Sequence, residues 1–358
     1  MRSESHSLRI GILGCGPIAQ FAHFESAQKA YNVELHSICD LAEDLLERMG
    51  QIWRPQKMYK DYDQMLKDEE IDAIIIATAD PFHVPLSIRA LEAGKHVLVE
   101  KPLTHSLEEC SQIEEIAEKT GKIVQVGHMK RFDPGIRYAK DFIQEKMGEV
   151  YALKAWYGDN THRYTATNNL QPLAIKSGLI KKPAIHPKAN LERYYMMAHG
   201  SHLLDTALYL GGEIGAVQSR FLQKSDFYSW FVDLEYKHGG LGHLDLSIKL
   251  RGDWHEGFQI YGEQGSINGK TYNPWFYKSS EVECFWEEDQ TYYRPLGADG
   301  FSYRRQLEHF AEVILKGKEA LGTSIQEART ITKAMIAIKR SVDTGQRLYL
   351  DEIQEGAL

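Results

Sequence analysis

A lysine stands where the chain reaches the end of a predicted buried strand. Glu100-Lys101-Pro102 directly follows the apolar run 96–99. Open parallel α/β sheets bind ligands in the crevice at the carboxyl ends of their strands, and the proline restricts the backbone of the lysine before it. A lysine held there can bind a hydroxyl or alkoxide oxygen as a positive point charge. Because isolated lysines usually only solvate a surface, this chemical interpretation depends on the surrounding elements.

A histidine further along the chain supplies the complementary chemistry. His202 lies in the segment 198–205, which reads Ala-His-Gly-Ser-His-Leu-Leu-Asp. Oxidation of a secondary alcohol removes a hydride and a hydroxyl proton, and an imidazole with an ordinary pKa near 6.5 can accept that proton. Asp205, one helical turn later, is expected to orient His202 or to cap the helix. The alternative is a helix-start histidine that makes only structural hydrogen bonds.

A glycine turn near the start of the chain predicts a nucleotide site. The β-type run 8–13 leads through Gly14-Cys15-Gly16-Pro17-Ile18-Ala19 into a helical pattern that continues to about residue 29. In this GxGxxA arrangement Gly14 allows the tight turn, and Gly16 lets the backbone approach a pyrophosphate that the helix N-terminus attracts. Proline is favoured at the first helical position. We therefore expect Gly14, Gly16, Pro17 and Ile18 to bind the cofactor, the alternative being a glycine turn without a ligand.

The second strand pattern, 33–39, ends in an acidic residue that bears on the choice of cofactor. Asp40 stands close to the spacing expected for the carboxylate that receives the adenosine ribose hydroxyls. A carboxylate there repels a 2′-phosphate, and the next residue is Leu41 with no arginine adjacent. The sequence therefore favours NAD over NADP.

Alternating strands and helices extend this motif into an architecture. Strands are predicted at 71–77, 96–99 and 122–126, and helices at 81–93 and 107–119. This alternation predicts a parallel, doubly wound sheet. Thr78 and His83 follow the strand 71–77 and are expected to face the nicotinamide side of the crevice, although His83 could equally lie on a helix surface.

The pattern changes from about residue 150. Strands are predicted at 150–156, 216–222, 227–236, 241–249 and 257–261, joined by short turns, which indicates an antiparallel sheet. The irregular stretch from about 158 to 193 is long enough to be a functional lid, a substrate loop or an oligomer arm. Helices are predicted at 302–315 and 324–341.

Composition narrows the class of protein. The 358 residues are enough for two domains, and 43% hydrophobic with 26% charged residues is ordinary for a globular chain. The net charge of −8 argues against a nucleic-acid partner. No apolar run approaches the roughly 20 residues of a membrane span, and the polar start lacks a signal-peptide core, so a cytoplasmic enzyme is expected. Four scattered cysteines without a CxxC pair indicate neither a zinc site nor a disulfide framework.

The ordered set of motifs resembles the glucose-fructose oxidoreductase, inositol dehydrogenase and MocA family over nearly the whole chain. The set comprises GxGxxA, Asp40, Glu100-Lys101-Pro102, the Gly-His-Met-Lys-Arg-Phe-Asp-Pro segment 127–134, the Gly-Ser-His-Leu-Leu-Asp segment 200–205 and the turn 262–267. The resemblance implies an NAD-binding Rossmann domain (1–128) and a substrate-binding and oligomerisation α+β domain (129–358) with a large open, mostly antiparallel sheet. It further implies a tightly held nicotinamide cofactor, a carbohydrate or cyclitol substrate, and a homodimer or homotetramer.

The resemblance also assigns roles to residues. Lys101 and His202 match the family's acid/base pair, whereas the aspartate four residues before the histidine is replaced by Ala198. His199 or an acid from the long loop could replace that carboxylate. His199, His202 and Asp205 could in principle share a metal, but no further ligand cluster is evident, so we predict none. Cofactor contacts are also expected from Glu100, Lys101 and Lys130, and substrate contacts from Lys101, Lys130, Arg131, Trp156, Asp159, His162, Arg163, Tyr194, His199 and His202.

The expected activity is NAD-dependent hydride transfer to or from a ring hydroxyl of a sugar, glycoside or cyclitol, with oxidation at C3 of a glycoside as the specific form. Two alternatives remain at this point. The first is a glycosidase that oxidises C3 transiently and then eliminates the aglycone. The second is a non-catalytic sugar or nucleotide sensor, against which the retention of both Lys101 and His202 argues.

Overall fold

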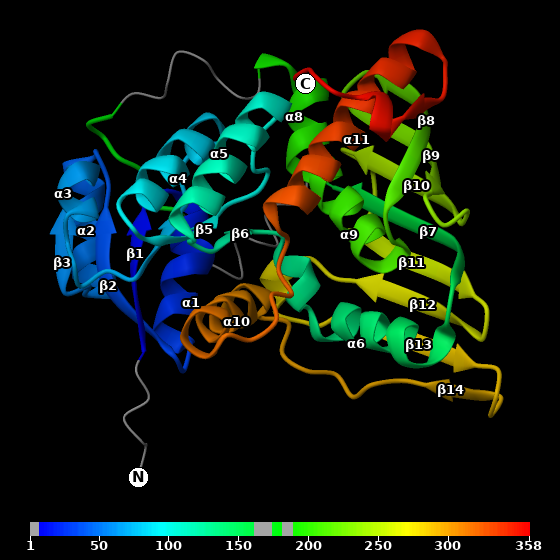
Figure 1. The fold of residues 1–358 in the computed structure, drawn as a ribbon, viewed down its shortest axis with the longest axis horizontal. Coiled ribbons are helices and arrows are strands. Elements are labelled where there is room, and N and C mark those ends of the chain that lie inside the picture. Colours follow the sequence, from blue (N-terminus) through cyan, green and yellow to red (C-terminus); the bar gives the residue numbers. More distant parts are fainter. Residues whose placement is uncertain (1–6, 161–173, 181–188) are drawn as a thin grey trace.

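The computed structural model describes residues 7–160, 174–180 and 189–358, and these form two sheets (Figure 1). The blue and cyan first half of the chain builds the smaller, parallel sheet. The green, yellow and orange second half builds the larger, mixed sheet. Within the described residues, no helix is long and apolar enough to cross a membrane.

A six-stranded sheet in the order β3-β2-β1-β4-β5-β6 forms the first domain, and all of its pairings are parallel. Every residue of β4 is buried, which is why such a strand reads as a continuous apolar run. The doubly wound parallel sheet predicted from the sequence is confirmed. Its strands are β1 (Leu8–Leu13), β2 (Val33–Cys39), β3 (Lys57–Tyr59), β4 (Ala73–Ile76), β5 (His96–Val99) and β6 (Val124–Val126).

Helices connect these strands on both faces of the sheet. The first runs without a break from Pro17 through the π-helical turn η1 (Ala19–His23) into α1 (Phe24–Lys29). Three elements, α2, β3 and α3, were not predicted from the sequence. Both β3 and α3 are too short to give a periodic signal, but in α2 the buried residues Leu45, Leu46 and Met49 do recur at helical spacing. The other helices are α2 (Glu43–Trp53), α3 (Tyr62–Leu66), η2 (Asp80–Phe82), α4 (His83–Glu92) and α5 (Leu107–Thr120).

A nine-stranded sheet in the order β14-β13-β12-β11-β7-β10-β9-β8-β15 forms the second domain. It is mostly antiparallel, as expected, but β7 and β10 pair in parallel. A long connection separates these two strands, and its described part contains α8, α9 and the hairpin of β8 and β9; such a crossover permits parallel pairing. The strands are β7 (Val150–Asp159), β8 (Ile214–Lys224), β9 (Phe227–Tyr236), β10 (Leu241–Ile248), β11 (His255–Gly262), β12 (Gly265–Thr271), β13 (Glu281–Trp286), β14 (Thr291–Tyr293) and β15 (Leu348–Tyr349).

The helices α6, α9 and α11 lie along one face of this sheet (Figure 1). Helix α10 instead packs on the first domain, where Leu307, Phe310 and Ala311 join the core around β1. The domain boundary at residue 128 stays a prediction. In the described residues of this half, the helices and helical turns are η3 (Met129–Phe132), α6 (Pro134–Phe142), η4 (Ile143–Met147), α8 (Leu191–Tyr195), η7 (Met196–Gly200), α9 (Ser201–Gly211), η8 (Pro274–Phe276), α10 (Ser302–Lys316), α11 (Ile325–Thr344) and η9 (Leu350–Glu352).

Candidate active site

A cavity of about 320 Å³ opens at the carboxyl edge of the six-stranded sheet, and side chains of both domains line it. The first domain contributes the segments after β1, β4 and β5. The second contributes the end of β7 and the helical stretch from α8 to α9. The predicted site residues on its wall are Ile18, Thr78, His83, Glu100, Lys101, Lys130, Asp159, Tyr194, His199 and His202.

Lys101 reaches this cavity from the end of β5. Its Nζ donates a hydrogen bond to the carbonyl oxygen of Ala198 in the second domain, at 3.0 Å. Burial lowers the pKa of the Lys101 amine below its ordinary value of 10.5, although the charge of Glu100 opposes the change. An ammonium group has three N–H donors, so this contact leaves Lys101 able to bind an oxygen of a ligand.

Glu100, the residue before the lysine, is held as a carboxylate. Its Oε1 accepts a hydrogen bond from Nε2 of the buried His23 at 2.8 Å. Burial by itself would raise the pKa of Glu100, but the hydrogen bond from His23 and the charge of Lys101 hold it below its ordinary value. A fixed negative charge therefore lies beside the lysine and favours its charged form.

His202 lies in the first turn of α9 and is 7% exposed. Its ring lies nearly parallel to that of Tyr157, with centroids 6.4 Å apart, and His128 approaches it edge-on at 5.9 Å. Burial lowers the pKa of the His202 imidazole well below 6.5, and the positive charge of Lys101 lowers it further. The imidazole is therefore neutral at neutral pH, the form in which a ring nitrogen can act as a proton acceptor.

Asp205 does not orient His202. Its carboxylate accepts hydrogen bonds from Arg131 Nε at 3.0 Å and from Thr323 Oγ1 at 2.9 Å. Arg131 also donates to Glu327 at 2.7 Å, and its side chain is buried away from the cavity wall. The structure therefore corrects the prediction that Arg131 binds substrate: its guanidinium forms ion pairs with two acids that lie 74 and 196 residues away in the sequence.

Lys130 lines the cavity, but its ammonium group is already engaged in an ion pair. It forms a buried ion pair with Glu256 of β11, and its Nζ lies 4.3 Å from the centre of the Tyr157 ring. Burial lowers the pKa of Lys130 and raises the pKa of Glu256, so each charge depends on the other. Glu256 gave no signal in the sequence because its partner comes from the other end of the domain.

A second pair of polar side chains, His199 and Asp159, also lines the cavity. Nε2 of His199 is 3.5 Å from Oδ2 of Asp159, and its Nδ1 is 3.3 Å from the Tyr157 hydroxyl. Asp159 ends β7 and is 1% exposed, and Tyr194 of α8 lies on the same wall. The acid from the start of the long connection thus lies beside the helical stretch that contains Ala198.

Trp156 does not line this cavity, contrary to the prediction. It contributes to a hollow formed with Gln259, Asn268 and Lys270, and its ring stacks on His255 at 5.6 Å. Successive residues of a strand face opposite sides of a sheet, so Trp156 and Asp159 of β7 cannot share a face. The neighbouring Tyr157 does line the cavity, and it lies on the same face of β7 as the buried residues Leu153 and Ala155.

Three further aromatic residues on the cavity wall were missed. Trp254 packs edge-on against Tyr157 at 5.1 Å, and Trp275 stacks on Tyr303 at 5.8 Å. Trp254 and Trp275 come from loops between strands, and Tyr303 comes from α10. No local pattern in the sequence places these segments together, because only the packing of the two domains does so.

The loops at the carboxyl edge of the first sheet fit a dinucleotide. Gly14 has φ +97°, and a Cβ there would lie 2.7 Å from the Ala77 carbonyl oxygen, whereas a Cβ on Gly16 would meet no heavy atom within 4 Å. Gly16 therefore faces open space at the start of the helix. Asp40 accepts hydrogen bonds from the Cys15 and Ala42 N–H groups, at 2.7 and 2.8 Å, which fixes its carboxylate beside the glycine turn. The buried Thr78 Oγ1 has no partner among the described residues.

His83 is a buried residue and does not lie on a helix surface. Its Nδ1 is 2.8 Å from the Pro102 carbonyl oxygen and its Nε2 is 3.2 Å from that of Thr78. The imidazole therefore links the loop after β4 to the loop after β5, in addition to lining the cavity. His162 and Arg163, which were also predicted to bind substrate, lie outside the described residues.

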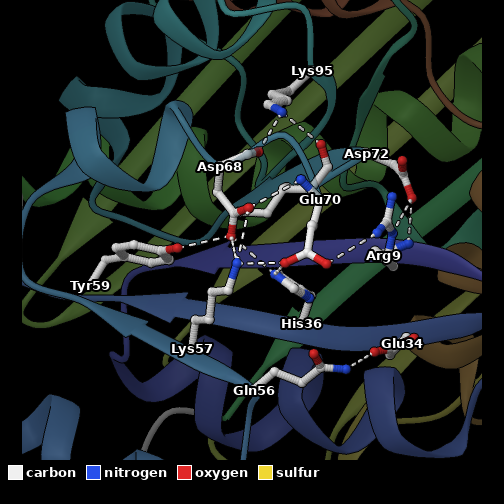
Figure 2. Close-up of polar contacts among 11 residues, drawn as sticks. Arg9, Glu34, His36, Gln56, Lys57, Tyr59, Asp68, Glu70, Asp72 and Lys95 are labelled. Carbon is white, nitrogen blue, oxygen red and sulfur yellow. Dashed lines mark hydrogen bonds and ion pairs between the residues drawn. The ribbon is translucent and has the colours of Figure 1, made fainter.

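A different charged cluster occupies the opposite, amino-terminal edge of the first sheet. Figure 2 shows Lys57, whose ammonium bonds Asp68 Oδ2 at 3.1 Å and Glu70 Oε2 at 2.6 Å, beside His36 and Tyr59. His36, Asp68 and Glu70 are the one group with metal-ligand spacing in the described part of the chain. Because the ammonium of Lys57 already bonds both acids, we interpret the cluster as an ion network.

The chain matches models of known protein families. An oxidoreductase family model with an NAD-binding Rossmann fold matches residues 8–128, and a GFO/IDH/MocA C-terminal domain model matches residues 136–268. A scyllo-inositol 2-dehydrogenase (NAD(+)) from Bacillus subtilis is 26% identical over 97% of both chains.

Two solved structures share the fold over nearly the whole length. Levoglucosan dehydrogenase in complex with NADH and levoglucosan has a TM-score of 0.77 at 18% identity, covering 96% of this chain and all of the other. An oxidoreductase from Agrobacterium radiobacter in complex with NAD⁺, L-tartaric acid and magnesium has a TM-score of 0.78 at 16% identity, covering 97% and 99%. The two family models match consecutive parts of the chain, and the first covers the parallel sheet with its glycine turn. This chain therefore belongs to the GFO/IDH/MocA family of oxidoreductases.

Proposed function

We propose that this protein is an NAD-dependent dehydrogenase that oxidises or reduces a ring hydroxyl of a sugar, glycoside or cyclitol. The observation that carries the proposal is the presence of Lys101 and His202 in one cavity, both buried, with the pKa of each lowered towards the neutral form. That cavity lies at the sheet edge where a dinucleotide fits. Groups with such perturbed titration in a cleft are typical of catalytic acids and bases.

In the proposed reaction, Lys101 provides a positive charge and His202 acts as the base. Lys101, still able to donate N–H bonds, holds the hydroxyl oxygen and stabilises negative charge as it develops there. His202 accepts the hydroxyl proton at its ring nitrogen when the alcohol is oxidised, and returns it when the carbonyl is reduced. The nicotinamide, when bound, accepts or donates the hydride. Tyr157 and His128 restrict the orientation of the His202 ring.

The rest of the cavity suits a polyhydroxylated ring. Asp159 and His199 offer hydrogen-bonding groups beside Ala198, and we assign them the contacts that the family's missing aspartate would make. Tyr157, Tyr194 and Trp254 offer flat apolar faces on which the C–H side of a sugar ring can pack. The relatives' names, an inositol dehydrogenase and a levoglucosan dehydrogenase, agree with this class of substrate. Oxidation at C3 of a glycoside is the specific form we propose.

The experiment is a panel of sugars, glycosides and cyclitols assayed for NADH formation, in parallel with NADP. We expect NADH to accumulate with at least one cyclic polyol and NADP to be the poorer acceptor. An aryl glycoside incubated without added cofactor tests the glycosidase alternative, since release of the aglycone without net NADH would replace our proposal. Binding of a sugar without turnover in any arm would indicate a sensor.

We further propose that two copies of the chain pair through the nine-stranded sheet. Strand residues Phe231, Leu241 and Tyr261 are exposed by 51%, 59% and 45%, and they alternate with the buried residues that face the helices. Replacing Phe231 with Asp should shift the mass measured by analytical ultracentrifugation towards the monomer. A wild-type chain that sediments as a monomer would contradict this proposal.

A further inference from the structure

Residues 174–180 lie apart from the domain to which the chain order assigns them. They belong to the connection between β7 and α8, both in the second domain, yet the green segment lies against the blue and cyan first domain (Figure 1). Ile175 packs on the core around β1. A connection of this length in a compact protein usually has a function, and the contacts of this segment show which part of the molecule it serves.

The first contact is with the helix that follows the glycine turn. The side-chain amide of Gln20 donates to the Ile175 carbonyl oxygen at 2.9 Å and accepts from the Ile175 N–H at 2.9 Å. The same amide donates to the carbonyl oxygen of Cys15, within the turn itself, at 2.8 Å. One side chain therefore joins the segment to the turn that is shaped for a pyrophosphate.

The second contact is with the helix that follows Asp40. Asp44, in the first turn of α2, accepts hydrogen bonds from Ser177 Oγ at 2.6 Å and from the Gly178 N–H at 2.7 Å. Ser177 Oγ in turn accepts from the Leu179 N–H at 3.0 Å, which folds the segment tightly at this point. The segment thus spans from the glycine turn to the element after the ribose-binding acid.

We propose that residues 174–180 form a wall of the cofactor site and retain the adenosine half of the dinucleotide, an inference that rests on the proposed function. In a Rossmann domain the adenosine lies between the glycine turn and the acid after the second strand, the two places to which Gln20 and Asp44 attach the segment. Asp159 and Tyr194, which precede and follow residues 174–180 along the chain, both line the cavity. Release of the cofactor requires both attachments to break.

The test measures NADH dissociation rather than turnover. In a stopped-flow chase with excess NAD⁺, the double variant Gln20→Leu with Asp44→Ala should release NADH roughly tenfold faster than wild type, because four hydrogen bonds of the attachment are lost. Each single variant should show a smaller increase. Glu47→Ala, which removes an exposed acid from the same helix, should leave the rate unchanged.

Limited trypsin digestion provides a second readout that does not depend on the rate of release. Lys176 is exposed within the segment, and saturating NADH should slow cleavage after it in the wild type but not in the double variant. If wild type and double variant both bind NADH and release it at equal rates, the proposed role of residues 174–180 is wrong, whereas the proposed dehydrogenase function still stands. A wild-type protein that binds no NADH would overturn both.

Discussion

Two clusters built from the same residue types lie at opposite edges of the parallel sheet, and they behave differently. At the amino-terminal edge Lys57, His36, Asp68 and Glu70 form an ion network (Figure 2). At the carboxyl edge Lys101 and His202 line the cavity. Lysine, histidine and acids occur in both clusters, so residue type alone does not distinguish a structural cluster from a chemical one.

The difference lies in how each environment acts on the charges. The hydrogen bonds that Lys57 donates to Glu70 and Asp68 raise the pKa of Lys57. Burial would raise the pKa of Asp68, but hydrogen bonds from the Glu70 N–H, Tyr59 and Lys57 hold it below its ordinary value. Charge is therefore stabilised on both members. In the cavity, burial lowers the pKa of both Lys101 and His202, so the charged form of each is less favoured than in water. Groups whose pKa is perturbed in this way are typical of functional sites.

The largest expected difference in kcat between the two clusters appears when the lysine of each is replaced. Lys101→Met should lower kcat by about 10²- to 10⁴-fold, because the alkoxide loses its positive partner, while NADH still binds. Lys57→Met should change kcat less than twofold. Steady-state kinetics and NADH titration on both variants check this. Similar losses of kcat in the two variants would mean that the two clusters do not differ in function.

A second matched pair tests the cofactor assignment. Asp40→Asn should reduce the preference for NAD over NADP roughly tenfold, since the carboxylate no longer repels a 2′-phosphate, whereas Asp68→Asn at the other edge should leave the preference unchanged. Asparagine preserves the shape of the side chain and one of the two oxygen acceptors that bond Cys15 and Ala42. The ratio of kcat/KM for the two cofactors is the measurement. An unchanged ratio in Asp40→Asn would remove Asp40 from the cofactor site.

Local patterns in the sequence predicted most of the first domain. The strands 8–13, 33–39 and 96–99 and the glycine turn are set by runs of neighbouring residues, and the structure reproduces the bounds of all three strands. The second sheet was also identified as mostly antiparallel. The parallel pairing of β7 and β10 could not be predicted, because it depends on which distant strands meet.

The sequence indicated those site residues that belong to local motifs. Lys101 and His202 were proposed from local motifs, and Asp159 from its place at the start of the long irregular stretch; all three line the cavity. Arg131 was misassigned because its partner Asp205 is fixed only by tertiary packing. Trp156 was misassigned because the strand was predicted to end there, whereas β7 continues to Asp159 and places the two residues on opposite faces of the sheet.

The pH dependence of activity should reveal the titration of the cavity pair. His202 must be neutral to accept a proton, and its pKa is lowered, so the acid limb of kcat/KM should lie below pH 6.5. Lys101 must be charged, and its pKa is also lowered, so the alkaline limb should lie below pH 10.5. Lys101→Arg, which stays charged, should lose the alkaline limb while keeping the acid one. Limbs that remain in place in this variant and in His202→Asn would assign the titration to other groups.

The smallest expected effect is on stability, at the amino-terminal edge. Lys57→Met should lower the melting temperature by no more than about 2 °C, because the Lys57 and Glu70 side chains are 40% and 55% exposed and water screens their attraction. Added salt should reduce even this difference. Since the folded pKa of Asp68 lies below its ordinary 3.8, the contribution of the network is fully present above that pH and disappears as acid protonates the carboxylate. Thermal melts of wild type and variant at low and high salt check the prediction, and a large, salt-independent loss would show that this edge contributes more to folding than its exposure implies.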